Sequence, residues 1–347
     1  MDGKQPRSTA EILRGALVLA ALALSACTSM APVADATRSF DASVKAGTDA
    51  MGDLYRGMND TEVGLYYLMI ELDPECDLGN KLTLFSPTDD SASLCKRPAD
   101  PDAESFVIEN PEVNPPFSSA GVNRRLQLLG AMSRYSRTLA MAASAESPAE
   151  YQKELAGLTT DLKSLETSIR ALDQNPASTA RDKSFVSSVV SPLSSLAGVV
   201  GRWVLEHKQK DAVQRAVRDG RESFEAIARF LAEDLDAIYA PAASTAAKER
   251  DATLKLYYST QRKKMTLAER AAFIQRVRDA AAASDAVKAA QPGAIPKGLI
   301  DAHSALVKAI NDSGRGDRDL ETVQASLERL LADLGVVVDS VRKLQAL

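Results

Sequence analysis

The sequence predicts an all-α protein: an elongated antiparallel helical bundle with coiled-coil-like packing and one irregular, disulfide-containing insert. Alanine supplies 56 of the 347 residues, whereas aromatic residues make up 5%. Alanine is the strongest helix former and fills wide cores poorly, so this composition favours closely packed helices over a sandwich or a barrel. The second observation is a set of long segments in which apolar residues recur at alternating spacings of three and four.

The first 26 residues have the features of a signal peptide. Lys4, Arg7 and Arg14 make the start basic, and residues 15–24 follow without a charged side chain. This apolar run is shorter than the about 20 residues that a transmembrane helix needs, but it has the size and position of the apolar region of a secretory signal. We therefore expect export and removal of residues 1–26, the alternative being a buried apolar helix.

Leu24-Ser25-Ala26-Cys27 ends this segment and resembles the lipobox of bacterial lipoproteins. In that family the peptide is cut before the cysteine, which carries diacylglycerol and palmitate, so the resemblance implies that Cys27 is a lipidated N-terminus. The family's inner-membrane retention signal is usually an aspartate at the next position, where this chain has Thr28. The resemblance covers residues 1–28 and implies a lipid anchor on the periplasmic face of the outer membrane, with 27–32 as a tether. A secretory signal with a chance cysteine is the alternative.

The rest of the mature chain is expected to form a helical domain over residues 33–347. Its first apolar stripe, which includes Phe40, Val44 and Met51, indicates one face of a long helix. The clearest later stripes run through Tyr151, Leu155, Leu158, Leu162, Leu165, Ile169 and Leu172, through Val213, Val217, Gly220, Phe224, Ile227 and Leu231, and through Leu320, Val323, Leu327, Leu330, Leu334, Val337, Val341 and Leu344. Because one heptad helix cannot bury its own seam, these helices must pack on each other or on a second copy of the chain.

Turn-forming residues divide the domain into its helices. Ser147-Pro148, Asn175-Pro176 and Ala240-Pro241 are among these breaks. The predicted helices are 33–72, 118–146, 149–173, 181–239, 242–290, 296–311 and 317–345. Short connections between them favour antiparallel neighbours.

Residues 73–117, which we call the insert, do not follow the helical pattern. They contain seven prolines, and their ten acidic and three basic side chains give a charge of −7. Removal of the signal peptide leaves 39 basic and 45 acidic residues, a charge of −6, so the helical body carries +1. Residues 81–85 and 106–108 are predicted to be two short strands.

The insert also contains Cys76 and Cys95. They are the other two of the three cysteines in the chain, since Cys27 is the expected lipid site. In an exported protein such a pair is expected to form a disulfide, which would stabilise the fold by about 3 kcal/mol. We expect the insert to recognise a protein partner in the cell envelope, the alternative being that its charge keeps an exposed loop soluble. The candidate binding residues are Asp89, Asp90, Asp100, Asp102 and Glu104.

The sequence gives no support for catalysis, a cofactor or a metal. Asp100-Pro101-Asp102 begins a calcium-loop pattern, but the pattern fails at Ser105 and Pro111, which occupy the positions of the required glycine and glutamate. His207 and His303 are expected on the surface or at helix caps. The phosphate-binding, hydrolase and zinc-protease motifs do not occur, and the net charge of −5 gives no general attraction for nucleic acid.

The segment 185–205 carries the main alternative function. Residues 185–201 contain no charged side chain. One interpretation is a buried central helix, and the other is a hairpin that inserts into a bilayer, as in helical pore-forming proteins. The sequence thus predicts a lipid-anchored binding scaffold, with a membrane-inserting protein as the alternative. An enzyme with a site built from dispersed acidic residues is the third class and has no supporting feature.

Overall fold

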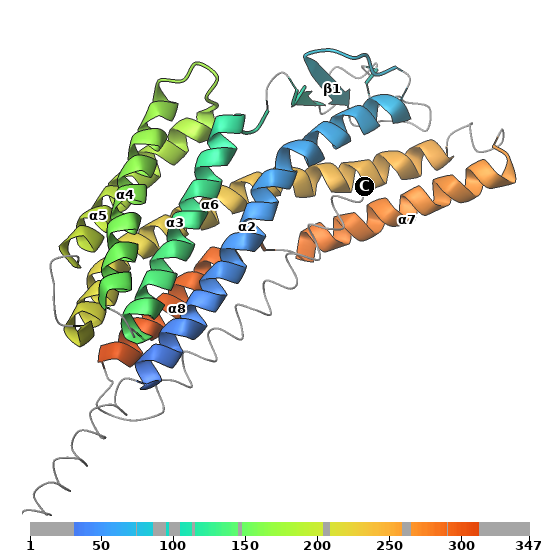
Figure 1. Ribbon diagram of the computed structural model, residues 1–347. Helices are drawn as coiled ribbons and strands as arrows, with labels where there is room; N and C mark the ends of the chain where they lie inside the picture. Colours follow the sequence, from blue (N-terminus) through green and yellow to red (C-terminus); the bar gives the residue numbers. More distant parts are fainter. Residues whose placement is uncertain are drawn as a thin grey trace, which may run out of the picture.

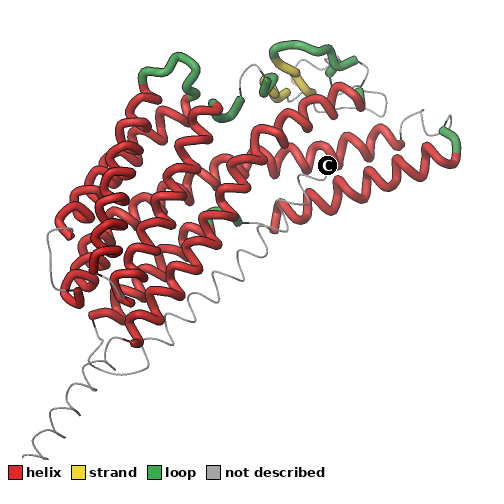
Figure 2. Tube along the Cα trace, in the orientation of Figure 1, coloured by secondary structure: helices red, strands yellow, loops and turns green. Residues whose placement is uncertain are grey.

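The computed structural model describes residues 31–73, 75–85, 95–96, 105–112, 115–144, 148–203, 209–258, 265–289 and 291–311. The predicted all-α class is confirmed there: most of the described residues are helical, and the rest include one short pair of strands (Figure 2). The helices in chain order are α2 (Ala31–Leu72), α3 (Ser119–Ser144), α4 (Pro148–Asp173), α5 (Ala180–Trp203), α6 (Gln209–Tyr258), α7 (Leu267–Ala289) and α8 (Ala294–Asn311).

Helix α2 is 42 residues long and therefore spans about 60 Å. It buries the predicted stripe: Phe40, Val44 and Met51 are all fully buried. The helix packs against α3 and α8 (Figure 1). Helix α8 packs on α2 at Gly47, where a Cβ would make ordinary van der Waals contacts of 3.4 Å with Ile295 and Leu299 of α8.

Helices α3 to α6 pack in chain order, with α4 between α3 and α5 and with α6 against α5 (Figure 1). The stripe of α4 is its core face, since every one of its leucines and isoleucines is buried: Leu155, Leu158, Leu162, Leu165, Ile169 and Leu172. The buried side chains of these helices and of α2 and α8 form one continuous apolar core.

The structure corrects two predicted helices, 181–239 and 242–290, the second of which is divided between α6 and α7. The predicted helix 181–239 is in fact two helices, because α5 ends at Trp203 and α6 begins at Gln209. Pro241 is not a break, since α6 continues through it to Tyr258 beside α7. A proline inside a helix removes one backbone hydrogen bond, and packing against a neighbouring helix outweighs that loss. The predicted helix 317–345 lies outside the described residues.

The two strands of the insert are β1 (Lys81–Phe85) and β2 (Ser105–Glu109), which pair antiparallel with Thr83 opposite Val107. They occupy the two segments predicted as strands. The pair lies over the C-terminal end of α2, far from the point where α2 begins (Figure 1). Helix α2 therefore separates the insert from the N-terminal end of the described chain.

Candidate functional site

Some of the predicted site residues lie in the part of the chain that the structure describes, and others lie outside it. Cys27 and the five acidic binding candidates, Asp89, Asp90, Asp100, Asp102 and Glu104, lie outside the described residues, and so does His207. Cys76 and Cys95 lie within them and are joined in a disulfide, with their Cα atoms 5.1 Å apart. The structure therefore describes how the insert is attached, and the acidic candidates remain a prediction.

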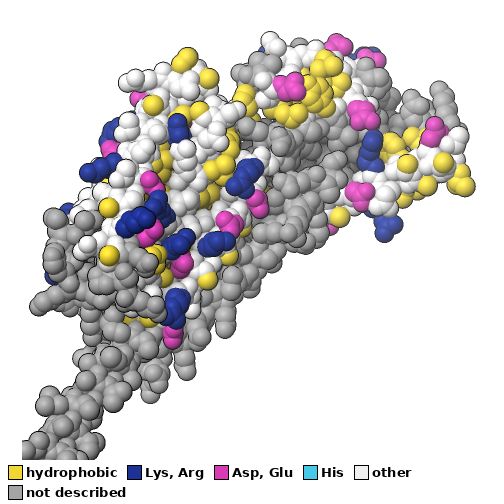
Figure 3. Space-filling view, in the orientation of Figure 1, with side chains coloured by type: hydrophobic (Ala, Val, Ile, Leu, Met, Phe, Trp, Pro, Cys, Tyr) yellow, Lys and Arg dark blue, Asp and Glu magenta, His cyan; other side chains and the backbone are white. Residues whose placement is uncertain are grey.

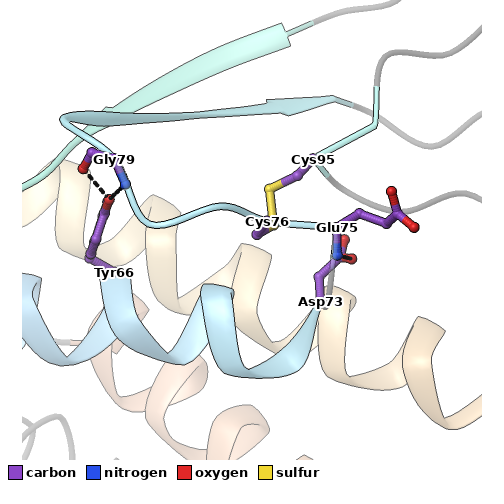
Figure 4. The surroundings of a disulfide bond; sticks show 6 residues. All are labelled: Tyr66, Asp73, Glu75, Cys76, Gly79 and Cys95. Carbon is purple, nitrogen blue, oxygen red and sulfur yellow. Dashed lines mark hydrogen bonds between the residues drawn. A yellow bond between two sulfur atoms is a disulfide. The ribbon is translucent and has the colours of Figure 1, made fainter.

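The disulfide lies directly after the end of α2 (Figure 4). Asp73, the first residue beyond α2, organises this turn: its carboxylate accepts the backbone N–H of Glu75 at 3.0 Å, and its carbonyl accepts that of Cys76 at 2.9 Å. The Asp73 carboxylate lies within 4.8 Å of both sulfur atoms. This group is not a metal site in the disulfide form, because disulfide sulfurs lack the thiolate charge that binds metals.

A second attachment joins the insert to the side of α2. The hydroxyl of Tyr66, which is fully buried, donates to the Gly79 carbonyl at 2.6 Å and accepts the Gly79 N–H at 3.2 Å (Figure 4). The Asn110 side chain donates to the same carbonyl at 3.0 Å. These bonds join the loop before β1 to Tyr66 of α2 and join the residue after β2 to that same loop. The base of the insert is therefore held at two points.

The insert presents apolar as well as charged side chains to solvent. Leu78 is 67% exposed and Val107 is 54% exposed. Tyr67 on α2 is also at the surface. Its hydroxyl donates to Glu112 at 2.7 Å, and this hydrogen bond raises the pKa of Tyr67. Exposed apolar side chains beside carboxylates are a common composition for a surface that binds a protein.

Four residues from four helices form what we call the buried ion-pair cluster: Tyr55, Arg125, Asp182 and Asp234. Arg125 of α3 donates from Nη1 to Asp182 Oδ1 at 2.9 Å and from Nε to Asp234 Oδ2 at 2.8 Å. The Tyr55 hydroxyl donates to the same oxygen of Asp234 at 2.8 Å. The cluster thus ties α2, α3, α5 and α6 together inside the core.

The second oxygen of Asp182 fixes the start of two helices. Its Oδ2 accepts the backbone N–H of Ser118 at 3.1 Å, next to the start of α3, and that of Thr179 at 3.0 Å, next to the start of α5. The Thr179 hydroxyl in turn accepts the N–H of Asp182 at 3.2 Å, which completes a capping box. Gly121 on α3 leaves the space that the Asp182 carboxylate occupies.

Aromatic rings enclose the guanidinium group of Arg125. Its Cζ atom lies 4.3 Å from the ring centre of Phe117 and 4.6 Å from that of Phe185. Burial alone would lower the pKa of Arg125, but the hydrogen bond and charge of Asp234 raise it. Burial, followed by the charge of Asp234, raises the pKa of Tyr55 well above its ordinary value. Because each group is hydrogen-bonded and none faces solvent, the cluster fits a structural role.

His303 corrects a prediction, because it lies fully buried in the core and not at the surface or a helix cap. Its ring stacks on Phe224, with ring centres 4.7 Å apart, and its Nε2 lies 3.2 Å from the Tyr135 hydroxyl. Burial lowers the pKa of His303 to about 3, so the ring is neutral near pH 7. The sequence held a usable signal, since His303 is four residues after Leu299 and three before Leu306, which places it on the core stripe of α8.

Helix α5 contains the segment of the alternative function, apart from residues 204 and 205, which lie outside the described residues. It is long and apolar enough to cross a membrane by length and composition, although its apolar face is turned to the core. Val189, Leu193 and Val200 are fully buried, and the exposed face consists largely of serine. In this structure the helix packs between α4 and α6, as expected of a central core helix.

No protein-family model, curated protein or solved structure matches the chain. Its function is therefore argued from its own residues: the insert held at the end of α2, the helices that support it, and the buried ion-pair cluster that joins those helices.

Proposed function

We propose that this protein is a lipid-anchored scaffold or binding protein of the bacterial outer membrane, which presents the insert to a basic protein partner in the periplasm. The observation that carries the proposal is the position of the insert. Helix α2 begins four residues after the expected lipid site at Cys27 and continues for 42 residues to the insert. A helix of that length places the insert about 60 Å from the start of the helix.

The attachment of the insert supports a recognition role. A loop that only kept the protein soluble would not need a disulfide, two hydrogen bonds to Tyr66 and a bond from Asn110 to hold its base. Rigid scaffolds that present irregular segments are a common way to build a binding surface. The exposed Leu78 and Val107 add apolar contact area to that surface.

The distribution of charge indicates the kind of partner. The insert has a charge of −7, against +1 for the rest of the mature chain. A basic protein would be drawn to such a surface at a rate that falls as the salt concentration rises. The helices serve as support, and we propose that they pack as an antiparallel bundle with coiled-coil-like contacts, which the heptad stripe of α4 and its burial support.

The packing of α5 supports this proposal over membrane insertion. For α5 to enter a bilayer, Phe185, Val189, Leu193 and the rest of its apolar face would have to leave the core. Asp182 at its first turn would also have to leave Arg125, and breaking such a buried ion pair typically costs about 3–5 kcal/mol. The insert requires no such rearrangement to meet a partner.

The proposal is tested by site-specific photo-crosslinking in the bacterial host, with the crosslinking residue in place of Leu78. We expect one predominant protein adduct. It should be lost when the five acidic candidates are changed to Asn or Gln. A matched control neutralises five exposed carboxylates of the helical body: Asp219, Glu222, Glu233, Asp285 and Asp301.

The control variant should keep the adduct, because it loses the same number of charges from another surface. An adduct that survives neutralisation of the insert, or that is lost equally in the control, would contradict recognition through the insert. Circular dichroism of both variants should show unchanged helix content, because the control side chains are exposed and the acidic candidates lie outside the predicted helices.

A further inference from the structure

A groove of about 560 Å³ lies between α2 and α3 and borders α4. Its volume is within the range of small-molecule binding sites. Helix α2 contributes Lys45, Thr48, Asp49, Gly52 and Arg56, helix α3 contributes Leu126, Leu129, Gly130, Ser133, Arg134 and Arg137, and helix α4 contributes Glu154. The groove is separate from the insert and from the buried ion-pair cluster.

Two glycines in helix interiors keep the groove open. A Cβ at Gly130 would meet no atom within 4 Å, and one at Gly52 would make ordinary contacts of 3.5 and 3.6 Å with Leu126 and Arg56. Packing therefore requires glycine at neither position, although glycine inside a helix is less stable than alanine by about 0.5–1 kcal/mol. Elsewhere in α3 and α6 the neighbours explain the glycine: Asp182 occupies the space at Gly121, and the Tyr135 hydroxyl that at Gly220.

More cationic than acidic side chains line the groove, in a chain whose net charge is negative. Four cationic side chains and two carboxylates line it, and two of the cations, Arg56 and Arg134, pair with Asp53 and Asp161 just outside the lining. Figure 3 shows Lys and Arg side chains interspersed with Asp and Glu side chains on this face of the helices. Arg134 and Arg137 are one helical turn apart on α3, and three-residue spacing places them on the same face.

The two arginines differ in how they are held. Arg134 reaches across to α4, where it pairs with Asp161 and lies 3.6 Å from Glu154, and Gly157 leaves room for its guanidinium group. Arg137 is exposed and has no ion pair with any residue of the described chain. One guanidinium is thus fixed beside the groove, and the other is available to an anion.

We propose that this groove binds a small organic anion that carries a phosphate or carboxylate group. The guanidinium fork of Arg137 matches the paired oxygens of either group, and Arg134, held by Asp161 and Glu154, lies one helical turn away. Leu126 and Leu129 supply an apolar surface for the remainder of the ligand, at the place where the two glycines leave space. This site is independent of recognition through the insert.

Isothermal titration of the purified full-length protein tests the proposal, with phenyl phosphate and benzoate as probes and benzyl alcohol as the uncharged analogue. We expect one saturable site for at least one anion and none for benzyl alcohol. Monomeric short-chain phosphatidylglycerol forms a separate arm, because a lipid headgroup carries the same phosphate chemistry. Binding of that lipid alone, or no saturable binding of either anion, would overturn the proposal.

Three variants locate the site. Arg137→Gln should weaken anion binding by about tenfold or more, because it removes charge-assisted hydrogen bonds. Gly130→Leu should also abolish binding by filling the groove, whereas Gly198→Leu, at an exposed glycine of α5 with equally open surroundings, should not. Arg218→Gln removes the same charge from α6, outside the groove, and should bind as the unchanged protein does.

Thermal unfolding of each variant checks the fold separately from binding. Both glycine variants should be at least as stable as the unchanged protein, because leucine is the better helix former. A stable Gly130→Leu protein that still binds the anion, or equal weakening by Arg137→Gln and Arg218→Gln, would show attraction to the surface in general and would overturn the groove as the site.

Discussion

Arg125 shows what a charged side chain can do inside an apolar core. It is fully buried, yet its bonds to Asp182 and Asp234 and its contacts with Phe117 and Phe185 leave no part of the guanidinium group unsatisfied. Buried ion pairs are a weak source of stability, because the loss of hydration offsets the attraction between the charges. Their loss is nevertheless severe, since each partner depends on the other.

Arg125→Met should therefore lower the free energy of unfolding by about 3–5 kcal/mol, because it leaves the carboxylates of Asp182 and Asp234 buried without a cation. Urea denaturation followed by circular dichroism measures the change. Arg229→Met on exposed α6 surface is the control and should change stability by less than about 0.5 kcal/mol. Equal stability of the two variants would show that the cluster is dispensable.

His303 makes the stability of the fold depend on pH. Its pKa in the folded protein is about 3, whereas an unfolded histidine has a pKa of about 6.5. Below pH 6.5 the unfolded chain binds a proton that the folded chain does not, so stability should fall by about 1.4 kcal/mol per pH unit between pH 6 and pH 4. Above pH 6.5 both states are neutral at this residue, and its effect disappears.

The measurement is the urea midpoint of the unchanged protein and of His303→Phe at several pH values. Phenylalanine keeps a ring against Phe224 but cannot take up a proton. The variant should lose less stability than the unchanged protein as the pH falls below 6.5. Parallel pH profiles would mean that another group is responsible for acid sensitivity.

At the residue scale, the local spacing shows which side chains are buried but not which residues they contact. Arg125 lies four residues after Gly121 and three before Leu128, so its position on the core face of α3 was readable. What the spacing does not reveal is its partners, because Asp182 and Asp234 are 57 and 109 residues away and meet it only when four helices pack. For His303 the residue type predicts the surface or a helix cap, whereas its spacing indicates the core, where it lies.

Helix α3 allows a paired test at the scale of the element, because two of its glycines serve opposite purposes. At Gly121 a Cβ would overlap the Asp182 carboxylate, whereas at Gly130 it would meet open space. Gly121→Ala should therefore destabilise the protein by about 1–3 kcal/mol, and Gly130→Ala should stabilise it by up to about 1 kcal/mol.

Thermal unfolding of the two variants gives the comparison. Helix propensity changes by the same amount in both, so the difference between them isolates the contact with Asp182. A rise in the melting temperature for both variants would mean that Asp182 moves aside without loss, and that its bond to Arg125 contributes little.

The helices themselves were predictable because each needs only a local pattern. The stripe of α4, from Leu155 to Leu172, predicted its buried face, and the turn residues Ser147-Pro148 and Asn175-Pro176 predicted its limits. The breaks were harder to predict, since Pro241 sits within α6 while the interruption after Trp203 has no proline. A proline removes one backbone hydrogen bond of a helix. The length of the helix depends more on the other helices that pack along it, and the local sequence does not show these contacts.

At the scale of the whole molecule, the proposed function depends on the anchor. Cys27→Ala should abolish labelling by radioactive palmitate and move the protein from the membrane to the soluble fraction. The resemblance of residues 24–27 to a lipobox is the reason. The control is a Cys76→Ala, Cys95→Ala double variant, which retains Cys27 and should be labelled as fully as the unchanged protein. Labelling of Cys27→Ala would contradict lipidation.

The disulfide gives the molecule a property that its sequence order does not suggest. Cys76 and Cys95 are 19 positions apart and close a covalent ring. A protease that cuts any peptide bond within this ring produces two chains that remain joined, since the sulfur bridge spans the cut. The cleaved protein keeps its helices and both strands as one covalent unit, and it separates into two fragments on a gel only after a reducing agent is added.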